Sequence, residues 1–233
     1  MSTAEQYLFT IIVVDYEDAV DRDDFRRAIR YLYEQTFQNF EILLIHDGPK
    51  KVRHRDELKP DHFNRINRII YTKFRHNDWG HSLRDIGIKE AQGKYILHHN
   101  ADNVLYTNGL QLIADTINLD LPDFEHETGH VYNKPDIIIF PILMRGLTTW
   151  SIPSGVRNVI RKPEHADKIG IILNGFPPRR GNIDCMQLVM KTELWRKEGG
   201  WYNKRIASDS TLYNKFTRKY GSRYVMEVIA EHW

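Results

Sequence analysis

Continuous apolar runs dominate the first half of the chain. Leu8–Val14 and Phe40–Ile45 are rich in aliphatic and β-branched residues, and a third run leads from Gly93 to the polar cluster Asn100–Asn103. Runs with little polar alternation are typical of strands buried on both faces, as in parallel sheets. A shorter run, Ile66–Tyr71, predicts one more strand. We therefore expect a parallel sheet in this half.

Helical periodicity separates these strands. Asp21 is the predicted N-cap of a first helix, Ser82–Gln92 predicts a second helix that ends at Gly93, and Thr107 is expected to cap a third. A strand, a helix and a parallel strand form a βαβ unit, which is right-handed in nearly every case. Residues 50–64 are weakly patterned and predict a helix or a loop. The expected apolar faces are Phe25, Ala28, Ile29 and Leu32, then Leu83, Ile86 and Ala91, then Leu110, Ile113, Ala114 and Ile117.

The second half has a less regular pattern. Residues 119–135 are acidic and irregular, and residues 145–182 contain four prolines, which predicts a mobile segment beside a site. Strands and helices are expected in the remainder, and Pro141 predicts an edge or a bulge in its strand. They are the strand Ile137–Met144, the strand Asp184–Met190, the short helix Glu193–Lys197, a helix with Leu212, Tyr213 and Phe216, and the strand Tyr224–Ala230.

Composition narrows the class of protein. The chain has 33 Lys and Arg against 31 Asp and Glu, a net charge of +2 that argues against a nucleic-acid backbone binder. The single cysteine, Cys185, excludes an internal disulfide and a multi-cysteine zinc site, so a reducing compartment is expected. We find no signal peptide and no run of about 20 apolar residues. The expected location is cytoplasmic, with peripheral membrane association and a membrane-lipid substrate left open.

Polar residues stand where the predicted strands end. Ligands bind beyond the carboxyl ends of parallel strands, which is where Asp15, Tyr16 and Asp47 lie. Asn100 and Asp102 follow the third strand and offer oxygen ligands of the kind that Mg²⁺ or Mn²⁺ prefers. The alternative for this cluster is an Asx-rich turn that ends a strand.

Several segments together resemble glycosyltransferase family 2, the nucleotide-sugar enzymes with the GT-A fold. The similarity lies in Phe9–Tyr16, in Gln35–Gly48, in Arg84–Ile88 with the strand leading to Asn100–Asp102, in Trp195–Trp201, and in Ser208 with Asp209. The resemblance implies an α/β fold, a Rossmann-type sandwich with a mainly parallel central sheet flanked by helices. It further implies one domain over 1–233, with a nucleotide-binding half of about 1–105 and an acceptor-side half of about 106–233. The chain could be one domain of a longer protein.

The resemblance also implies roles for individual residues. Tyr16 would stack on the nucleotide base, Asp47 would accept from a base N–H, and Arg84 would lie near the diphosphate. Asp209 would be the general base of an inverting transfer to a glycan or lipid-linked hydroxyl, from a nucleoside-diphosphate sugar of which UDP is the favoured nucleotide. The remaining implied contacts are Val14, Asn100 and Ala101 with the nucleotide, and Asp102 and His232 with Mn²⁺ or Mg²⁺.

The chain departs from the family pattern at three places, one of which is Val14 with Asp15, where the family usually has small polar residues before the tyrosine. Asn100 stands where the family has the first acid of its DxD metal motif, so weaker metal binding is expected. Ser208 replaces the glutamate that usually precedes the base. These departures motivate a second hypothesis, a non-catalytic relative that binds a nucleotide-sugar or glycan. For Asp209 taken alone, a helix N-terminal carboxylate is the competing interpretation.

A zinc-protease signature also occurs. His126, Glu127 and His130 fit H-E-x-x-H, which requires both histidines on one face of a stable helix. Gly129 lies inside the motif and the neighbouring residues lack a helical period, so a loop with coincidental histidines is the better interpretation. Zinc hydrolysis is kept as a remote alternative.

Overall fold

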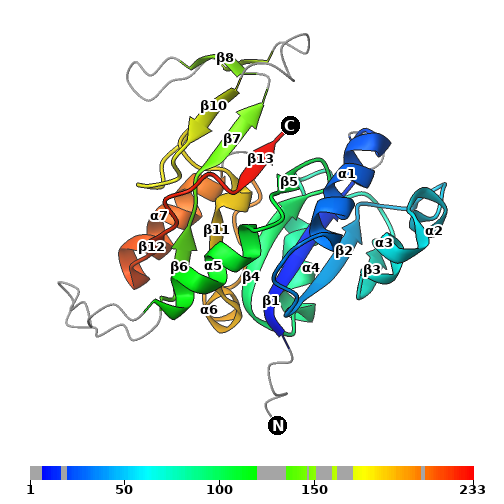
Figure 1. The fold of residues 1–233 in the computed structure, drawn as a ribbon, viewed down its shortest axis with the longest axis horizontal. Coiled ribbons are helices and arrows are strands. Elements are labelled where there is room, and N and C mark those ends of the chain that lie inside the picture. Colours follow the sequence, from blue (N-terminus) through cyan, green and yellow to red (C-terminus); the bar gives the residue numbers. More distant parts are fainter. Residues whose placement is uncertain are drawn as a thin grey trace.

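The chain forms an α/β fold around a central sheet of seven strands (Figure 1). This computed structural model describes residues 7–16, 20–119, 135–145, 147–150, 159–161, 170–205 and 208–233. The order in the central sheet is β12-β6-β11-β4-β1-β2-β3. These strands are Arg223–Tyr224, Ile137–Ile139, Leu188–Lys191, Gly93–Asn100, Tyr7–Asp15, Phe40–His46 and Arg68–Tyr71.

All strands of the central sheet except β11 run in one direction. β1 pairs in parallel with β2 and with β4, and β2 pairs in parallel with β3. β11 is antiparallel to both of its neighbours, β4 and β6, and β12 is parallel to β6. The prediction of a mainly parallel central sheet flanked by helices is confirmed.

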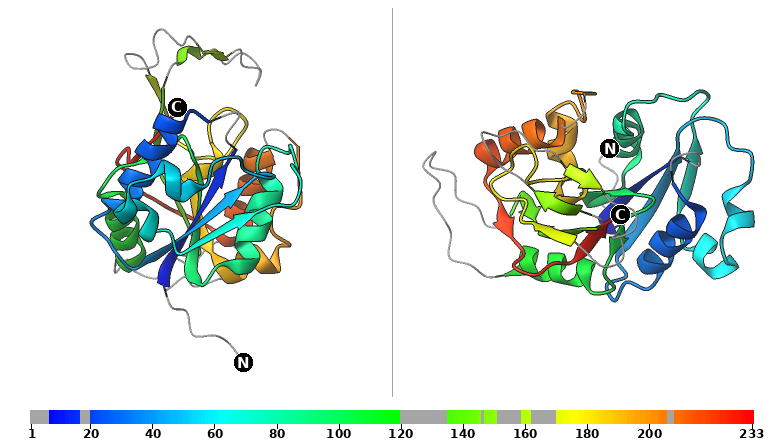
Figure 2. Two further views of the ribbon diagram at one scale, coloured as in Figure 1. Left: turned by 90° about the vertical axis from the view of Figure 1, so that its right-hand side faces the viewer. Right: turned by 90° about the horizontal axis from the view of Figure 1, so that it is seen from above.

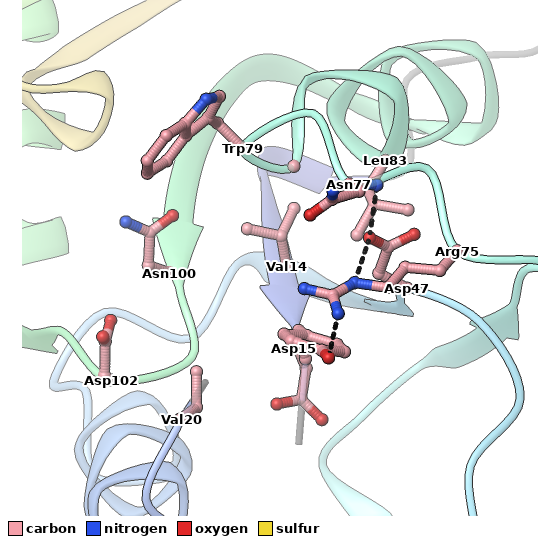
Figure 3. Close-up of a pocket in the computed structure, with 12 residues that line it drawn as sticks. Val14, Asp15, Val20, Asp47, Arg75, Asn77, Trp79, Leu83, Asn100 and Asp102 are labelled. Atoms are coloured by element: carbon pink, nitrogen blue, oxygen red, sulfur yellow. Dashed lines mark hydrogen bonds and ion pairs between the residues drawn. The ribbon is translucent and has the colours of Figure 1, made fainter. Parts of the chain in front are cut away.

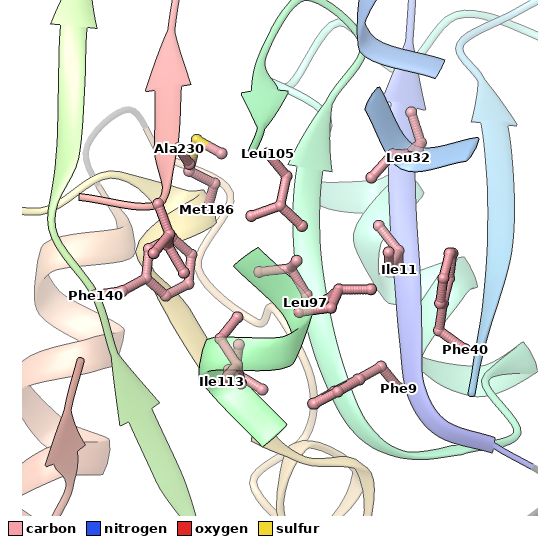
Figure 4. Close-up of a cluster of buried hydrophobic side chains, with 14 of the residues drawn as sticks. Phe9, Ile11, Leu32, Phe40, Leu97, Leu105, Ile113, Phe140, Met186 and Ala230 are labelled. Atoms are coloured by element: carbon pink, nitrogen blue, oxygen red, sulfur yellow. The ribbon is translucent and has the colours of Figure 1, made fainter. Parts of the chain in front are cut away.

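The buried residues of β1 alternate between two hydrophobic clusters, one on each face of the sheet. Phe9, Ile11 and Val13 pack with α1 (Arg22–Tyr33) and α5 (Gly109–Asn118), whose inward faces are the predicted ones. Ile12 and Val14 pack with α4 (His81–Glu90), α6 (Thr192–Lys197) and α7 (Ser208–Tyr220). Figure 4 shows the first cluster, which draws side chains from both halves of the chain, from Phe9 to Ala230.

A four-stranded sheet lies beyond the carboxyl end of β6. Its order is β10-β7-β13-β5, and its strands are Gly170–Leu173, Ile142–Arg145, Ala230–His232 and Val104–Leu105. The figures show it beside the upper end of the central strands (Figures 1 and 2). A third sheet pairs β8 (Leu147–Trp150) with β9 (Val159–Arg161). Among the described residues, no helix is long and apolar enough to cross a membrane.

The structure corrects several predicted boundaries in the second half. The predicted strand Ile137–Met144 is two strands in different sheets, because the chain passes from β6 to β7 at Phe140 and Pro141. The predicted strand Tyr224–Ala230 is wrong: β12 ends at Tyr224 and β13 begins at Ala230. Asp184 caps a 3₁₀ turn, Cys185–Gln187, that precedes β11. Residues 145–182, expected to be irregular, include three strands among their described residues.

Two predicted helix ends are also different. Gly93 is the first residue of β4 rather than a C-cap, and a Cβ there would lie 2.5 Å from the backbone of Phe9 and Thr10. The side chain of Thr107 does not cap α5; Gln35 Oε1 instead accepts from the N–H of Leu110 at 3.1 Å. Asp21 does cap α1, as predicted. Residues 50–64 hold two short helices, α2 (His54–Glu57) and α3 (Pro60–Asn64).

Candidate active site

Parallel pairing aligns the carboxyl ends of β1, β2 and β4 at one edge of the central sheet. Val14 pairs with Asn100 and Asp15 pairs with His46, so the polar residues after these strands meet there. A cavity of about 620 Å³, here called the strand-end cavity, opens at this edge (Figure 3). The residues predicted from sequence that line it are Val14, Tyr16, Asp47, Asn100 and Asp102.

Asp47 and Arg75 lie together at one side of the strand-end cavity (Figure 3). Tyr16 lines the same cavity and contacts Arg75. The guanidinium of Arg75 lies 3.3 Å from the ring centroid of Tyr16 and hydrogen-bonds the Tyr16 hydroxyl. Asp47 accepts from the backbone N–H groups of His76 at 2.8 Å and Asn77 at 3.2 Å. Asp47 therefore fixes the turn that carries Arg75. Sequence reasoning missed Arg75, which lies in an unpatterned loop.

Asp15 belongs to the same rim but its carboxylate is fully engaged. Arg22 donates to both carboxylate oxygens, at 2.9 and 3.2 Å, and His54 Nε2 lies 2.8 Å from Oδ2. Arg22 also binds Glu57 at 3.0 Å. Burial opposes ionisation, but the hydrogen bonds from His54 and Arg22 outweigh it and hold the pKa of Asp15 well below its usual range. This aspartate ties β1 to α1 and α2.

A second cavity of about 180 Å³, here called the Asp209 cavity, adjoins the first. It brings together predicted residues from four distant segments: Arg84 of α4, Asn100 of β4, Asp209 of α7 and His232 of β13. Trp79 and Asn100 line both cavities. The two cavities thus meet at the end of β4.

Arg84 is a buried cation whose contacts are neutral. It is 2% exposed and donates to Trp79 O at 2.7 Å, Asn100 Oδ1 at 2.6 Å and Cys185 Sγ at 3.1 Å. Within the described part of the chain, no carboxylate lies within 4.0 Å of its guanidinium. Buried charges are normally paired with an opposite charge. The guanidinium of Arg84 therefore places a positive charge on one side of the Asp209 cavity, where it could meet an anion, while the carboxyl groups of Asp184 and Asp209 line the same cavity.

Asp209 has the opposite electrostatic situation to Asp15. Burial in the cavity, together with the nearby charge of Asp184, raises the pKa of Asp209 to about 7, although the N–H of Ser210 donates to Oδ1 at 2.7 Å. The competing interpretation of Asp209 as a helix N-terminal carboxylate accounts for that hydrogen bond alone. A carboxylate with this pKa can exchange a proton near neutral pH.

The residue before Asp209 is held by a stacked pair of rings. Ser208 Oγ accepts from Trp201 Nε1 at 2.9 Å and lies 3.2 Å from His81 Nε2. The rings of His81 and Trp201 stack with centroids 4.9 Å apart. His81 directly follows Gly80, which lines the strand-end cavity. The contacts of His81 thereby link α4 to the start of α7.

His232 pairs with Asp184, a second residue that sequence reasoning missed. His232 Nε2 lies 3.7 Å from Asp184 Oδ2, and both line the Asp209 cavity. His232 Nδ1 is buried and has no hydrogen-bond partner among the described residues. Asp184 was hidden because the sequence places it at the start of an apparent strand.

The polar cluster after β4 divides in the structure. Asp102 lines the strand-end cavity, whereas Ala101 is fully buried and its N–H donates to Val14 O at 3.0 Å. Ala101 is absent from both cavity walls, so its implied nucleotide contact stays a prediction. The described residues hold no preformed group of three or more His, Cys, Asp or Glu side chains suited to a metal. The motif His126–His130 lies outside the described residues.

Comparisons with known proteins identify the family and the fold of this chain. Residues 6–163 match the sequence model of the family described as Glycosyl transferase family 2. An uncharacterized glycosyltransferase of Rickettsia prowazekii is 30% identical over 156 residues, covering 58% of this chain and 46% of the relative. Another from Rickettsia bellii is 30% identical over 86 residues, covering 37% of this chain and 12% of the relative. The chain thus spans less than half the length of these relatives.

Solved structures share the fold at low sequence identity. The crystal structure of S. aureus TarS 1–349 has a TM-score of 0.62 and 14% identity, covering 96% of this chain and 59% of that one. A mannosyltransferase from Pyrobaculum calidifontis, in complex with GDP-Man and Mn²⁺, has a TM-score of 0.58 and 13% identity, covering 97% of this chain and 56% of that one. With the family match over most of the chain, we conclude that this protein belongs to glycosyl transferase family 2 and has the GT-A fold.

Proposed function

We propose that this protein is an inverting glycosyltransferase that moves a sugar from a nucleoside diphosphate to an acceptor hydroxyl. One observation carries this proposal: Asp209, a carboxylate with a pKa of about 7, faces a cavity that adjoins the strand-end cavity. A general base needs a pKa near the working pH and a place beside the bound donor. Asp209 meets both requirements.

The donor nucleotide would occupy the strand-end cavity. Tyr16 and Arg75 offer a planar surface for the base, and Asp47 holds the turn that carries Arg75. Structural neighbours have been solved with UDP, with UDP-GlcNAc and with GDP-Man. A UDP-sugar is our favoured donor, with Val14 and Asn100 in the cavity wall.

The diphosphate would extend from the strand-end cavity toward Arg84. The buried guanidinium would neutralise the charge that develops on the leaving group, in a site where water screens it little. The acceptor oxygen would attack the anomeric carbon from the face opposite the diphosphate, while Asp209 takes the hydroxyl proton. The new C–O bond forms as the bond to the phosphate oxygen breaks, which inverts the anomeric configuration.

A divalent cation fits this site through a small number of protein ligands. Asp102 lines the strand-end cavity, and His232 lines the adjoining Asp209 cavity. His232 Nδ1 is buried and has no hydrogen-bond partner among the described residues. Mg²⁺ and Mn²⁺ often take only one or two protein ligands beside substrate phosphates. When bound, Mn²⁺ or Mg²⁺ would stabilise negative charge on the diphosphate. Asn100 would contribute little as a ligand, because its Oδ1 already accepts from Arg84.

The acceptor is proposed to be a glycan or a lipid-linked glycan, and a single domain over 1–233 is also proposed. Hydrophobic side chains from Phe9 to Ala230 share one cluster, which supports the single domain. The second candidate function, a non-catalytic nucleotide-sugar binder, is favoured by Asn100 in place of an acid. In that case nucleotides would bind but no sugar would move.

A donor screen separates these functions. The purified chain is incubated with UDP-, GDP- and dTDP-sugars and a mixture of glycan and lipid-linked acceptors, and nucleoside diphosphate release is measured. Release that requires both donor and acceptor supports transfer. A thermal shift with a nucleoside diphosphate but no release from any donor supports the binding relative, and no shift with any nucleotide would contradict both.

A further inference from the structure

Trp79 is a large exposed aromatic side chain at the junction of the two cavities. It lies in the turn between β3 and α4 and is 68% exposed. Of the residues that the structure describes, only Trp79 and Asn100 line both the strand-end cavity and the Asp209 cavity. Figure 3 shows its indole above Asn100, on the side away from Asp47 and Arg75.

The backbone of Trp79 has a conformation that bulky residues rarely adopt. Its φ is +62°, in the left-handed region, and Gly80 beside it has a φ of +77°. A side chain gains nothing from this conformation by itself, and glycine would adopt it without strain. Arg84 holds the turn in place by donating to Trp79 O at 2.7 Å. The buried cation of the site and the orientation of the indole are therefore coupled.

The exposed indole of Trp79 and its strained backbone together indicate a ligand that packs on the ring. The indole contributes little to the core, so neither feature serves the stability of the fold. An aromatic face carries partial negative charge and packs well on apolar surfaces whose hydrogens are slightly positive. One face of a pyranose ring presents such a surface through its C–H bonds.

The position of Trp79 indicates which sugar would pack on its ring. In the proposed function the nucleotide lies between Tyr16 and Asn100, and Asp209 is the general base beside the acceptor. The part of the donor between the diphosphate and the acceptor is the sugar that is transferred. Resting on the proposed function, we propose that Trp79 is the platform on which the pyranose of the donor packs, so that it recognises the sugar and not the nucleotide.

The test compares an intact donor with its nucleotide alone. By calorimetry, the wild type and variants are titrated with UDP, UDP-GlcNAc, GDP and GDP-mannose. Trp79→Ala should weaken binding of the intact donor by about 3- to 10-fold, the range expected for an aromatic stack, with less than a twofold change for the free diphosphate. Trp79→Phe should retain most of the donor affinity.

Two further variants separate the ring from the backbone. Trp79→Gly removes the ring and also relieves the positive φ, so it should fold at least as well as the wild type and lose donor affinity as Trp79→Ala does. Phe74→Ala is the matched control, because Phe74 is 64% exposed in the same turn but lines neither cavity. It should change neither affinity.

The outcomes divide cleanly. Parallel losses for donor and free diphosphate would overturn the proposal and make Trp79 a support of the nucleotide site. Unchanged donor affinity with a raised KM for acceptor would also overturn it and assign the ring to the acceptor. If the wild type binds the free diphosphates and the sugar adds no affinity, the proposed role of Trp79 is contradicted, whereas the proposed nucleotide site is retained. If the wild type binds none of the four probes, the proposed function fails and the platform with it.

Discussion

Asp15, which is buried, and Asp209, which is partly buried, lie at neighbouring parts of one site, yet they have opposite surroundings. Asp15 is clasped by Arg22 and His54, which lower its pKa. Asp209 accepts from backbone N–H groups, among them that of Ser210, yet burial and the nearby charge of Asp184 raise its pKa to about 7. A carboxylate paired with cations stabilises the fold, whereas one with a raised pKa is available for chemistry.

The difference extends to how each region is built. The residues of the strand-end cavity that the sequence predicted lie at or just after the carboxyl ends of β1, β2 and β4, so the register of these parallel strands places them. The Asp209 cavity draws on α4, the 3₁₀ turn before β11, α7 and β13, which are distant in sequence. Backbone register therefore places the predicted part of the first region, whereas long-range side-chain contacts place the second.

The largest expected effect is the loss of transfer in Asp209→Asn. The amide cannot take a proton from the acceptor, so turnover should fall by about 10²- to 10⁴-fold. The affinity for the donor, measured by calorimetry, should stay within about twofold. A loss of transfer smaller than tenfold would contradict the base assignment.

A loss of stability is expected from Asp15→Asn. The change leaves Arg22 and His54 without their shared anion and should lower the free energy of unfolding by about 3 kcal/mol, measured by urea denaturation. Asp23→Asn, on the exposed start of α1, is the control and should have little effect. Because the folded pKa of Asp15 lies below its unfolded value of 3.8, its contribution is present above pH 3.8 and lost as the pH falls further. If the Asp15→Asn variant is as stable as the Asp23→Asn control, the structural role assigned to Asp15 is contradicted.

The pH dependence of activity tests the raised pKa of Asp209. Below pH 7 the group is increasingly protonated, so kcat/KM should drop about tenfold for each pH unit and level off above about pH 7. Asp184→Asn removes a repulsive charge and should move this acidic limb to lower pH, by up to about one unit. A limb that stays in place in Asp184→Asn would argue against the repulsion.

The smallest expected effect comes from Asn100→Asp. A carboxylate at this position would pair with Arg84, which now donates to Asn100 Oδ1 at 2.6 Å. Affinity for UDP in the presence of EDTA should fall by about 3- to 10-fold, because the cation is already neutralised. Added Mn²⁺ should recover more affinity in the variant than in the wild type. Equal affinity in EDTA for both proteins would show that Arg84 does not bind the diphosphate.

The sequence predicted the first half of the fold well, because its strands are continuous apolar runs and its helices have clear periods. Prediction failed where a short break redirects the chain from one strand to the next. At Pro141 one apolar run divides between two sheets, and residues 225–229 separate two strands that looked like one.

The candidate site shows the same division. Tyr16, Asp47 and Asn100 were found because they follow strands, and Asp209 and His232 were found by resemblance alone. Arg75 and Trp79 were missed because they lie in a loop without periodicity, where Trp79 has a positive φ, and Asp184 was missed because it begins an apparent strand. The positions of all three depend on contacts with distant segments. Such contacts leave no local pattern in a single sequence.

The burial of Arg84 has a consequence for binding at different ionic strengths. Salt screens exposed charges strongly and buried ones weakly. Arg84 is 2% exposed, whereas the side chain of Arg75 is 44% exposed. The attraction of Arg84 for the diphosphate should therefore persist in high salt, while the attraction of Arg75 for the nucleotide base weakens. As salt is added, the site should lose its selectivity among nucleotides before it loses its affinity for them.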